Sequence, residues 1–248
     1  MNISEIESNV KVKNQPNNLD KQLHPKMAKE LPNYNGFCMV ISGSSGSGKT
    51  TLLYSLMTGT SRDGIKRGYK RVFDKVYIVS PTIANNSIKN DPFNTIPENQ
   101  IYRELTSESL DEIKENLEKN RENDLNSCLI LDDVGSEIKR SKQVEKKLTS
   151  LIQNRRHLYT SIIVLVQKFR DLPTGIRNNM SQFISFRPKN MIEREAITSE
   201  LFNFKKDQME QIMNYVFNDR HSFLYVDMSL KNDGNYIYHK NFNRLQLN

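Results

Sequence analysis

The chain of 248 residues is long enough for one large α/β domain with extensions, and it is too short for two domains of ordinary size. Its formal net charge of +7 favours a polyanionic partner. The longest apolar run, Ile162 to Val166, is far shorter than the ~20 residues that a membrane span needs, and the polar N-terminus lacks the apolar core of a signal peptide. We therefore expect a soluble, intracellular protein without stable membrane insertion.

Apolar strands and helices alternate along most of the chain. Residues 1–35 show no sustained hydrophobic period and are rich in Asn, Lys, Glu and Pro, so we expect an N-terminal arm there. The elements expected next are strand 37–42, helix 49–58, strand 75–80, helix 107–121, strand 127–132, helix 142–157, strand 161–167 and strand 182–186. Strands this apolar, separated by helices, indicate an α/β fold with a mainly parallel sheet that helices cover on both faces.

The remaining segments are less regular. Residues 82–99 contain prolines and several asparagines, and we expect them to form the longest loop. After the sheet, the pattern predicts helices at 192–202 and 205–217, followed by a hairpin of strands 222–228 and 235–239.

The first chemical signal lies between the first strand and the first helix. Gly43, Gly48, Lys49 and Thr50 match the phosphate-binding pattern G-x-x-x-x-G-K-[ST] in full, in the strand–loop–helix setting that it requires. The glycines let successive N–H groups converge on phosphate oxygens. Lys49 is expected to reach the β- and γ-phosphates, the Thr50 hydroxyl to bind Mg²⁺, and the helix N-terminus to face the anion. The residues expected to contact the nucleotide are Gly43, Ser44, Ser45, Gly46, Ser47, Gly48, Lys49, Thr50 and Thr51.

The second signal is the sequence SCLILDDV, in which four apolar residues end at Asp132 and Asp133. Two adjacent carboxylates at the end of a buried strand repel each other unless a cation lies nearby. We expect Asp132 to help Thr50 hold Mg²⁺, and Asp133 to polarise the attacking water. The alternative interpretation is a solvated turn that one of the carboxylates caps.

The third signal is Gln167, a polar residue that closes the apolar strand SIIVLVQ. At the tip of a strand beside the γ-phosphate, its amide would orient water or sense the loss of the phosphate. The polar end of an ordinary strand explains the residue equally well.

These motifs and their order resemble one protein family. GSSGSGKTT, LILDDV and NRRHLYTSIIVLVQKFRDLPTGIRNNMSQFI are similar to the genome-packaging ATPases of large double-stranded DNA viruses, the poxvirus-type branch of the FtsK/HerA superfamily. The resemblance covers roughly residues 37–186. Its most particular part follows the acidic pair, because phosphate-binding loops alone occur in too many families to identify one.

The resemblance implies a RecA-like core with strand order 5-1-4-3-2, within a core at 36–190 that a C-terminal extension at 191–248 completes. It implies an ATP-hydrolysing, DNA-translocating motor that uses ATP and Mg²⁺, assembles as a ring, usually a hexamer and at least a pentamer, and packages double-stranded DNA with capsid proteins as further partners. Such a protein would work in the host cytoplasm, in a viral factory, or in the virion. Arg156 corresponds to an arginine finger given to the next subunit, with Arg155 as the adjacent alternative, and Arg177 matches a basic sensor. The expected catalytic residues are Lys49, Asp132, Asp133, Arg156, Gln167 and Arg177.

Three other functions compete with this one. Asp132 to Gly135 also fit the D-x-x-G pattern of GTPases, but the guanine-reading N-K-x-D is absent. A small-molecule kinase needs a basic lid, which residues 66–71 would supply, although an acidic pair and a glutamine suit the activation of water better. A nucleotide-switched structural protein would bind ATP without repeated turnover.

Two smaller features complete the sequence analysis. In the RecA-like order, one strand separates Cys38 from Cys128, so the cysteines would lie about 9–10 Å apart, beyond the reach of a disulfide, and we expect no metal site there. The basic residues 66–71, interleaved with Tyr69 and Phe73, would contact a DNA backbone or form a solvated loop with an aromatic anchor.

Overall fold

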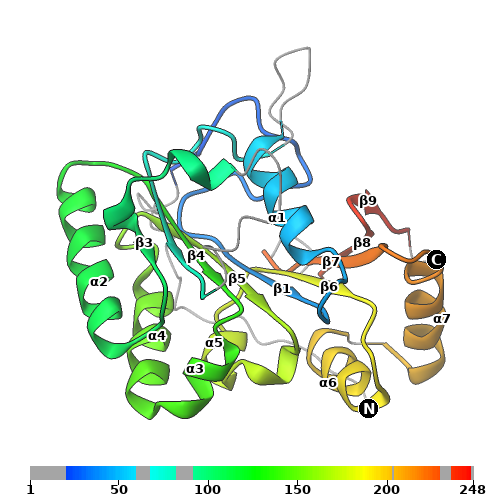
Figure 1. The fold of residues 1–248 in the computed structure, drawn as a ribbon. Helices are drawn as coiled ribbons and strands as arrows, with labels where there is room; N and C mark the ends of the chain where they lie inside the picture. Colours follow the sequence, from blue (N-terminus) through cyan, green and yellow to red (C-terminus); the bar gives the residue numbers. More distant parts are fainter. Residues whose placement is uncertain (1–20, 60–67, 82–91, 203, 230–235, 247–248) are drawn as a thin grey trace, which may run out of the picture.

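A computed structural model of the protein describes residues 21–59, 68–81, 92–202, 204–229 and 236–246. One nine-stranded sheet of order β3-β2-β4-β5-β1-β6-β7-β8-β9 runs through the molecule, with helices on both faces (Figure 1). The strands are β1 (Cys38–Ser42), β2 (Lys75–Val79), β3 (Ile101–Tyr102), β4 (Ser127–Asp132), β5 (Thr160–Val166), β6 (Gln182–Phe186), β7 (Phe223–Asp227), β8 (Ile237–Lys240) and β9 (Asn243–Arg244). The helices are α1 (Lys49–Thr58), α2 (Ser107–Glu122), α3 (Gly135–Arg140), α4 (Lys142–Asn154), α5 (Thr174–Arg177), α6 (Met191–Leu201) and α7 (Lys206–Val216).

The five central strands lie in the order that the RecA-like core requires. β1 pairs in parallel with β5 on one side and with β6 on the other, and β4 and β2 follow beyond β5. The predicted order 5-1-4-3-2 is therefore confirmed for these strands, but the sheet is larger than predicted. β3 extends one edge, and the predicted C-terminal hairpin, β7 with β8, joins the other edge antiparallel to β6.

The two faces of the sheet bury different parts of the chain. The six helices α2 to α7 pack on one face, where alternate residues of each strand point toward them. The other face lies under α1, the segment 21–35 and the short helical turns near Phe93 (Figure 1). Because both faces are covered, the central strands are apolar throughout, which explains why the sequence shows runs and not alternation.

Residues 21–35 do not extend away from the domain. Met27 and Leu31 are buried against the sheet, and Gln22 pairs with Tyr34 in an antiparallel bridge. Tyr69 is buried beside this segment, stacks on Phe37 with 5.3 Å between ring centroids, and donates its hydroxyl to the Pro32 carbonyl at 3.3 Å. Tyr69 is thus the aromatic anchor of the basic segment. Lys66 and Arg67 of that segment, and residues 1–20 of the expected arm, lie outside the described residues.

The remaining expectations have mixed outcomes. Cys38 and Cys128 are free and lie on strands that β5 separates, with one side chain in the core of each sheet face. Most of the expected long loop lies outside the described residues, and residues 92–95 and 98–100 form 3₁₀ turns. No helix in the described part of the chain has the length and apolarity to cross a membrane.

Candidate nucleotide-binding site

Three of the sequence signals meet at one edge of the sheet, where the parallel strands β1, β4 and β5 end. The ladder continues one step past the strands: Gly43 N–H donates to the Val166 carbonyl at 3.1 Å, and Asp133 N–H donates to the Leu165 carbonyl at 3.2 Å. Gly43, Asp133 and Gln167 therefore follow directly on three adjacent strands. This edge is where ligands bind in open α/β sheets.

The loop between β1 and α1 has the backbone of a phosphate cradle. Gly46 and Gly48 have φ angles of 74° and 110°, a region in which a side chain would be strained. Lys49 opens α1 and turns back over the loop, where its ammonium donates to the carbonyls of Gly43 at 2.6 Å and Ser44 at 3.2 Å. With a phosphate in the loop, this ammonium would leave the two carbonyls and donate to the phosphate oxygens instead.

The two carboxylates of the acidic pair accept hydrogen bonds from different side chains. Asp132 accepts a hydrogen bond from the Ser80 hydroxyl at the end of β2, at 3.3 Å. Asp133, whose φ is 57°, accepts from the Gln167 amide on both carboxylate oxygens, at 3.1 and 3.0 Å. The structure thus brings Gln167 and Asp133 together, whereas Asp132 has a different hydrogen-bond partner, and the roles expected of the two carboxylates stay predictions.

The charges at this edge are partly desolvated. Burial lowers the pKa of Lys49 from its usual value, although the two carboxylates act in the opposite direction. Burial is also the main cause of a raised pKa at Asp132, with repulsion from Asp133 adding to it, while the Ser80 hydrogen bond and Lys49 lower it. A cation near Asp132 would relieve this cost.

The chain offers Mg²⁺ a small set of oxygen ligands. Within the described residues there is no group of three His, Cys, Asp or Glu side chains that would hold a metal. Mg²⁺ commonly binds through one or two carboxylates together with substrate phosphates and water, so Asp132 with the hydroxyl of Thr50, in the first turn of α1, is a fitting donor set. When bound, the ion would neutralise charge on the phosphates.

We expect Ser80→Ala to shift the acid limb of turnover toward higher pH. The hydroxyl favours the ionised form of Asp132, so its loss raises the pKa of Asp132 further, and at mildly acidic pH less of the carboxylate that we expect to bind Mg²⁺ is ionised. The measurement is the pH profile of Mg²⁺-dependent hydrolysis, with Ser80→Thr, which keeps a hydroxyl, as the control. An acid limb that is the same in Ser80→Ala and in the unchanged protein would contradict the assignment.

A cleft of about 320 Å³ lies beside the phosphate loop. Its walls are Ser42 to Ser45, the end of β5, the segment after β6 and the first turns of α6, and three of its residues are the cations Lys168, Arg187 and Lys189. The sequence analysis missed these cations, although each follows a predicted strand that ends at the nucleotide edge. Their charge suits a ligand that carries phosphate.

His221 is a second residue that the sequence did not reveal. It precedes β7, and its Nδ1 lies 3.3 Å from the carbonyl oxygen of Ser47, within the phosphate loop. No motif connects two residues 174 positions apart, and only the addition of β7 beside β6 brings them together.

Two of the predicted arginines lie at the amino ends of the parallel strands, opposite the phosphate loop. Arg155 and Arg156 follow α4 and precede β5, so the full length of β5, about 23 Å for seven residues, separates them from the phosphate loop of the same chain. Arg155 Nε donates to the Gly36 carbonyl at 2.8 Å and its Nη1 to the Ile152 carbonyl at 2.7 Å. Neither arginine can reach the phosphate loop of its own chain.

Arg177, the expected sensor, is engaged within the chain. Its Nε donates to the Glu200 carboxylate at 2.8 Å, its Nη2 to the Thr174 hydroxyl at 3.3 Å, and its Nη1 to the Leu172 carbonyl. The guanidinium also lies 5.3 Å from the centre of the Phe169 ring, two residues after Gln167. These contacts tie α5 and the end of β5 to α6.

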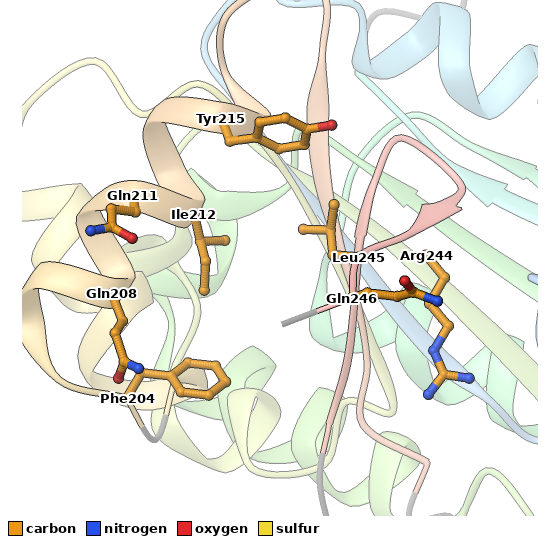
Figure 2. A pocket seen from close by; sticks show the side chains of 8 residues that line it. All are labelled: Phe204, Gln208, Gln211, Ile212, Tyr215, Arg244, Leu245 and Gln246. Atoms are coloured by element: carbon orange, nitrogen blue, oxygen red, sulfur yellow. The ribbon is translucent and has the colours of Figure 1, made fainter. Parts of the chain in front are cut away.

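A larger cavity of about 490 Å³ lies elsewhere, between α7 and the C-terminal segment. Figure 2 shows its lining, in which side chains of α7 face those of Arg244, Leu245 and Gln246. None of the motif residues contributes to it, and among the described residues that line it Arg244 is the charged one.

The arrangement of β1 between β5 and β6, with a lysine-bearing glycine loop leading into α1, defines the class of P-loop proteins with a RecA-like strand order. Within that class the profile of the family described as Poxvirus A32 protein matches residues 26–240, and the chain belongs to this family.

Individual relatives agree with the family. The chain is 32% identical over 160 residues to the DNA packaging protein OPG160 of Variola virus, which covers 60% of this chain and 53% of that protein. It thus spans about half the length of the curated relatives it matches. Among solved structures, the DNA-packaging ATPase B204 from Sulfolobus turreted icosahedral virus aligns with a TM-score of 0.61 and 18% identity, over 83% of this chain and 98% of that one. The B204 NTPase of Sulfolobus turreted icosahedral virus 2, in complex with ATP-gammaS, aligns with a TM-score of 0.54 and 15% identity, over 83% and 97%.

Proposed function

We propose that this chain is the ATPase of a motor that packages viral double-stranded DNA. The observation that carries the proposal is the meeting of Lys49, Asp133 and Gln167 at one sheet edge, within a chain of the poxvirus A32 family. Relatives of this chain are named for DNA packaging, and a structural neighbour is described in complex with an ATP analogue. The net charge of +7 suits a DNA partner.

The chemistry follows from the side chains at the edge. Lys49 and the loop N–H groups would bind the β- and γ-phosphates, with Mg²⁺ held by Thr50 and Asp132. Asp133, fixed on both oxygens by Gln167, would accept a proton from the attacking water. The cations Lys168, Arg187 and Lys189 line the cleft beside the loop and would add positive potential around the nucleotide.

We further propose that the active site is completed by a neighbouring copy in a ring. Arg156 lies too far from the phosphate loop of its own subunit, but a head-to-tail ring places different faces of two copies in contact. Arg155, whose guanidinium donates to two backbone carbonyls of its own chain, is the adjacent alternative. A hexamer is the expected assembly. Arg177 would act within its own subunit by holding α5 to α6, and not by direct contact with phosphate.

The domain organisation and the setting belong to the same proposal. Residues 36–190 would form the hydrolytic core, and residues 191–248 would complete it, as the contact of His221 with the loop suggests. Capsid proteins would be further partners in the viral factory or the virion.

We expect ATP turnover that rises when long double-stranded DNA is added, from particles with the mass of a ring. Turnover is measured with and without DNA, and mass by light scattering. Lys49→Ala, which should abolish turnover because it removes a charge-assisted contact to phosphate, controls for contaminating ATPases. ATP binding without repeated hydrolysis would identify a nucleotide-switched structural protein instead. A preference for GTP would favour the GTPase interpretation.

A further inference from the structure

Backbone hydrogen bonds and side-chain contacts fix the conformation of the turn that carries Arg156. Residues 154–160 close on themselves, because Tyr159 N–H donates to the Arg156 carbonyl at 3.3 Å and Thr160 N–H donates to the Arg155 carbonyl at 3.0 Å. Tyr159 has a φ of 48°, which a bulky side chain rarely adopts. Such a conformation persists only where the surroundings determine it.

The first of those surroundings is Gly36. Its carbonyl accepts from Arg155 Nε, and its N–H donates to the Ser161 hydroxyl at 3.2 Å. Its φ is 82°, and a Cβ built on it would lie 2.9 Å from both Cα and Cγ of Arg156. The backbone of Gly36 therefore packs directly on Arg156, at a distance that no other residue type allows.

The second contact point is Lys21, at the other end of the same segment. Its ammonium lies 4.8 Å from the centre of the Tyr159 ring and 2.6 Å from Asp124 Oδ1. Arg121, in the last turn of α2, lies over the same ring with its Cζ at 3.9 Å. Asn35 N–H donates to the Lys21 carbonyl at 2.9 Å, so the two ends of the segment are joined to each other as well as to the turn.

We propose that the segment 21–36 positions Arg156 for catalysis in the neighbouring subunit. This inference rests on the proposed function, in which Arg156 acts in trans. Gly36 and Lys21 are positioning residues: neither touches the nucleotide, and both act through the turn 154–160. Because the turn is fixed, the backbone of Arg156 is already in place, and less conformational entropy is lost when its guanidinium contacts the neighbour's γ-phosphate. The segment thereby connects the N-terminal part of one subunit to the reaction rate of the next.

The experiment distinguishes a subunit that cannot supply its arginine to the neighbour from a subunit whose own phosphate loop does not work. Two variants, Gly36→Ala and Lys21→Met, are assayed alone and in mixtures with either Lys49→Ala or Arg156→Ala subunits. Gly36→Ala should lower kcat by about 10²-fold with KM for ATP unchanged, because misplacement by about 1 Å costs this much. Lys21→Met keeps the backbone intact and should lower kcat about two- to fivefold. Lys29→Met, an exposed lysine of the same segment, is the matched control and should change nothing.

The mixtures give the deciding result. Gly36→Ala has a working phosphate loop and a misplaced arginine, so Lys49→Ala subunits, which carry an intact Arg156, should restore its activity, whereas Arg156→Ala subunits should not. Equal recovery in both mixtures, or none in either while Arg156→Ala is still rescued by Lys49→Ala, would overturn the proposal. If Arg156→Ala itself were not rescued despite co-assembly, the trans role of Arg156 would be wrong instead. Should Gly36→Ala fail to fold, the same two mixtures with Lys21→Met decide the question.

Discussion

Arg156→Ala should lower ATP turnover of the assembled protein by about 10³–10⁵-fold, the range for arginines supplied in trans to a phosphoryl transfer. The guanidinium is permanently charged and stabilises charge on the γ-phosphate as the bond breaks. Nucleotide affinity should change little, because the phosphate loop of the same subunit is about 23 Å away along β5. Turnover of the unchanged protein should rise more steeply than linearly with protein concentration.

Mixing makes this prediction specific. Inactive Arg156→Ala subunits combined with inactive Lys49→Ala subunits should regain part of the activity, since some interfaces then pair an intact loop with an intact arginine. Arg244→Ala, which removes an exposed arginine from β9 at the far edge of the sheet, is the matched control and should remain active. Absence of recovery at every mixing ratio, with co-assembly confirmed by light scattering, would move the role to Arg155 or Arg177.

Asp133→Asn should lower hydrolysis by about 10²–10⁴-fold while ATP still binds, because the amide cannot accept the proton of the attacking water. Asparagine tolerates the positive φ of 57° at this position, and its side chain can still pair with Gln167, so the backbone and the turn should be preserved. The effect should therefore appear in kcat and not in the unfolding temperature.

Asp132→Asn is the internal comparison. It removes the carboxylate that we assign to Mg²⁺, so it should raise the Mg²⁺ concentration needed for half-maximal activity. Titrations of nucleotide and of metal distinguish the two variants. Identical behaviour of both in both titrations would show that the division of roles within the acidic pair is wrong.

Much of the fold could be predicted because its central strands are buried on both faces. Such strands read as short apolar runs, and the predicted bounds of β4 and β6 agree with the structure. The two-residue β3 and the six-residue α3 are too short to show a hydrophobic period. The packing of residues 21–35 was also missed, because the composition of the segment is that of a mobile arm and its buried positions, Met27 and Leu31 among them, show no sustained hydrophobic period.

The site divides in the same way. A motif is contiguous, so the phosphate loop and the acidic pair could be found from local spacing, and parallel pairing explains why Gln167 meets Asp133. The places of His221, Ser80 and the cations of the cleft at the site are determined by which strands become neighbours. A local sequence pattern carries no information about strand neighbours. Gly36 illustrates the limit well: its close approach to Arg156 is set by a φ angle and a contact across 120 positions of sequence.

The position of β1 also determines when the nucleotide site can form. The hydrogen bonds on either side of this strand join Gly36 to Ser161 and Cys38 to Ser181, across 125 and 143 positions of sequence. Contacts of such long range form slowly, since the loop between them must first be closed. During synthesis the phosphate loop leaves the ribosome before β5 and β6, so its supporting strand has two unpaired edges until they have followed. A chain interrupted before residue 186 therefore exposes an apolar strand edge that is ready to pair with other copies, and the phosphate loop gains its supporting sheet late in folding.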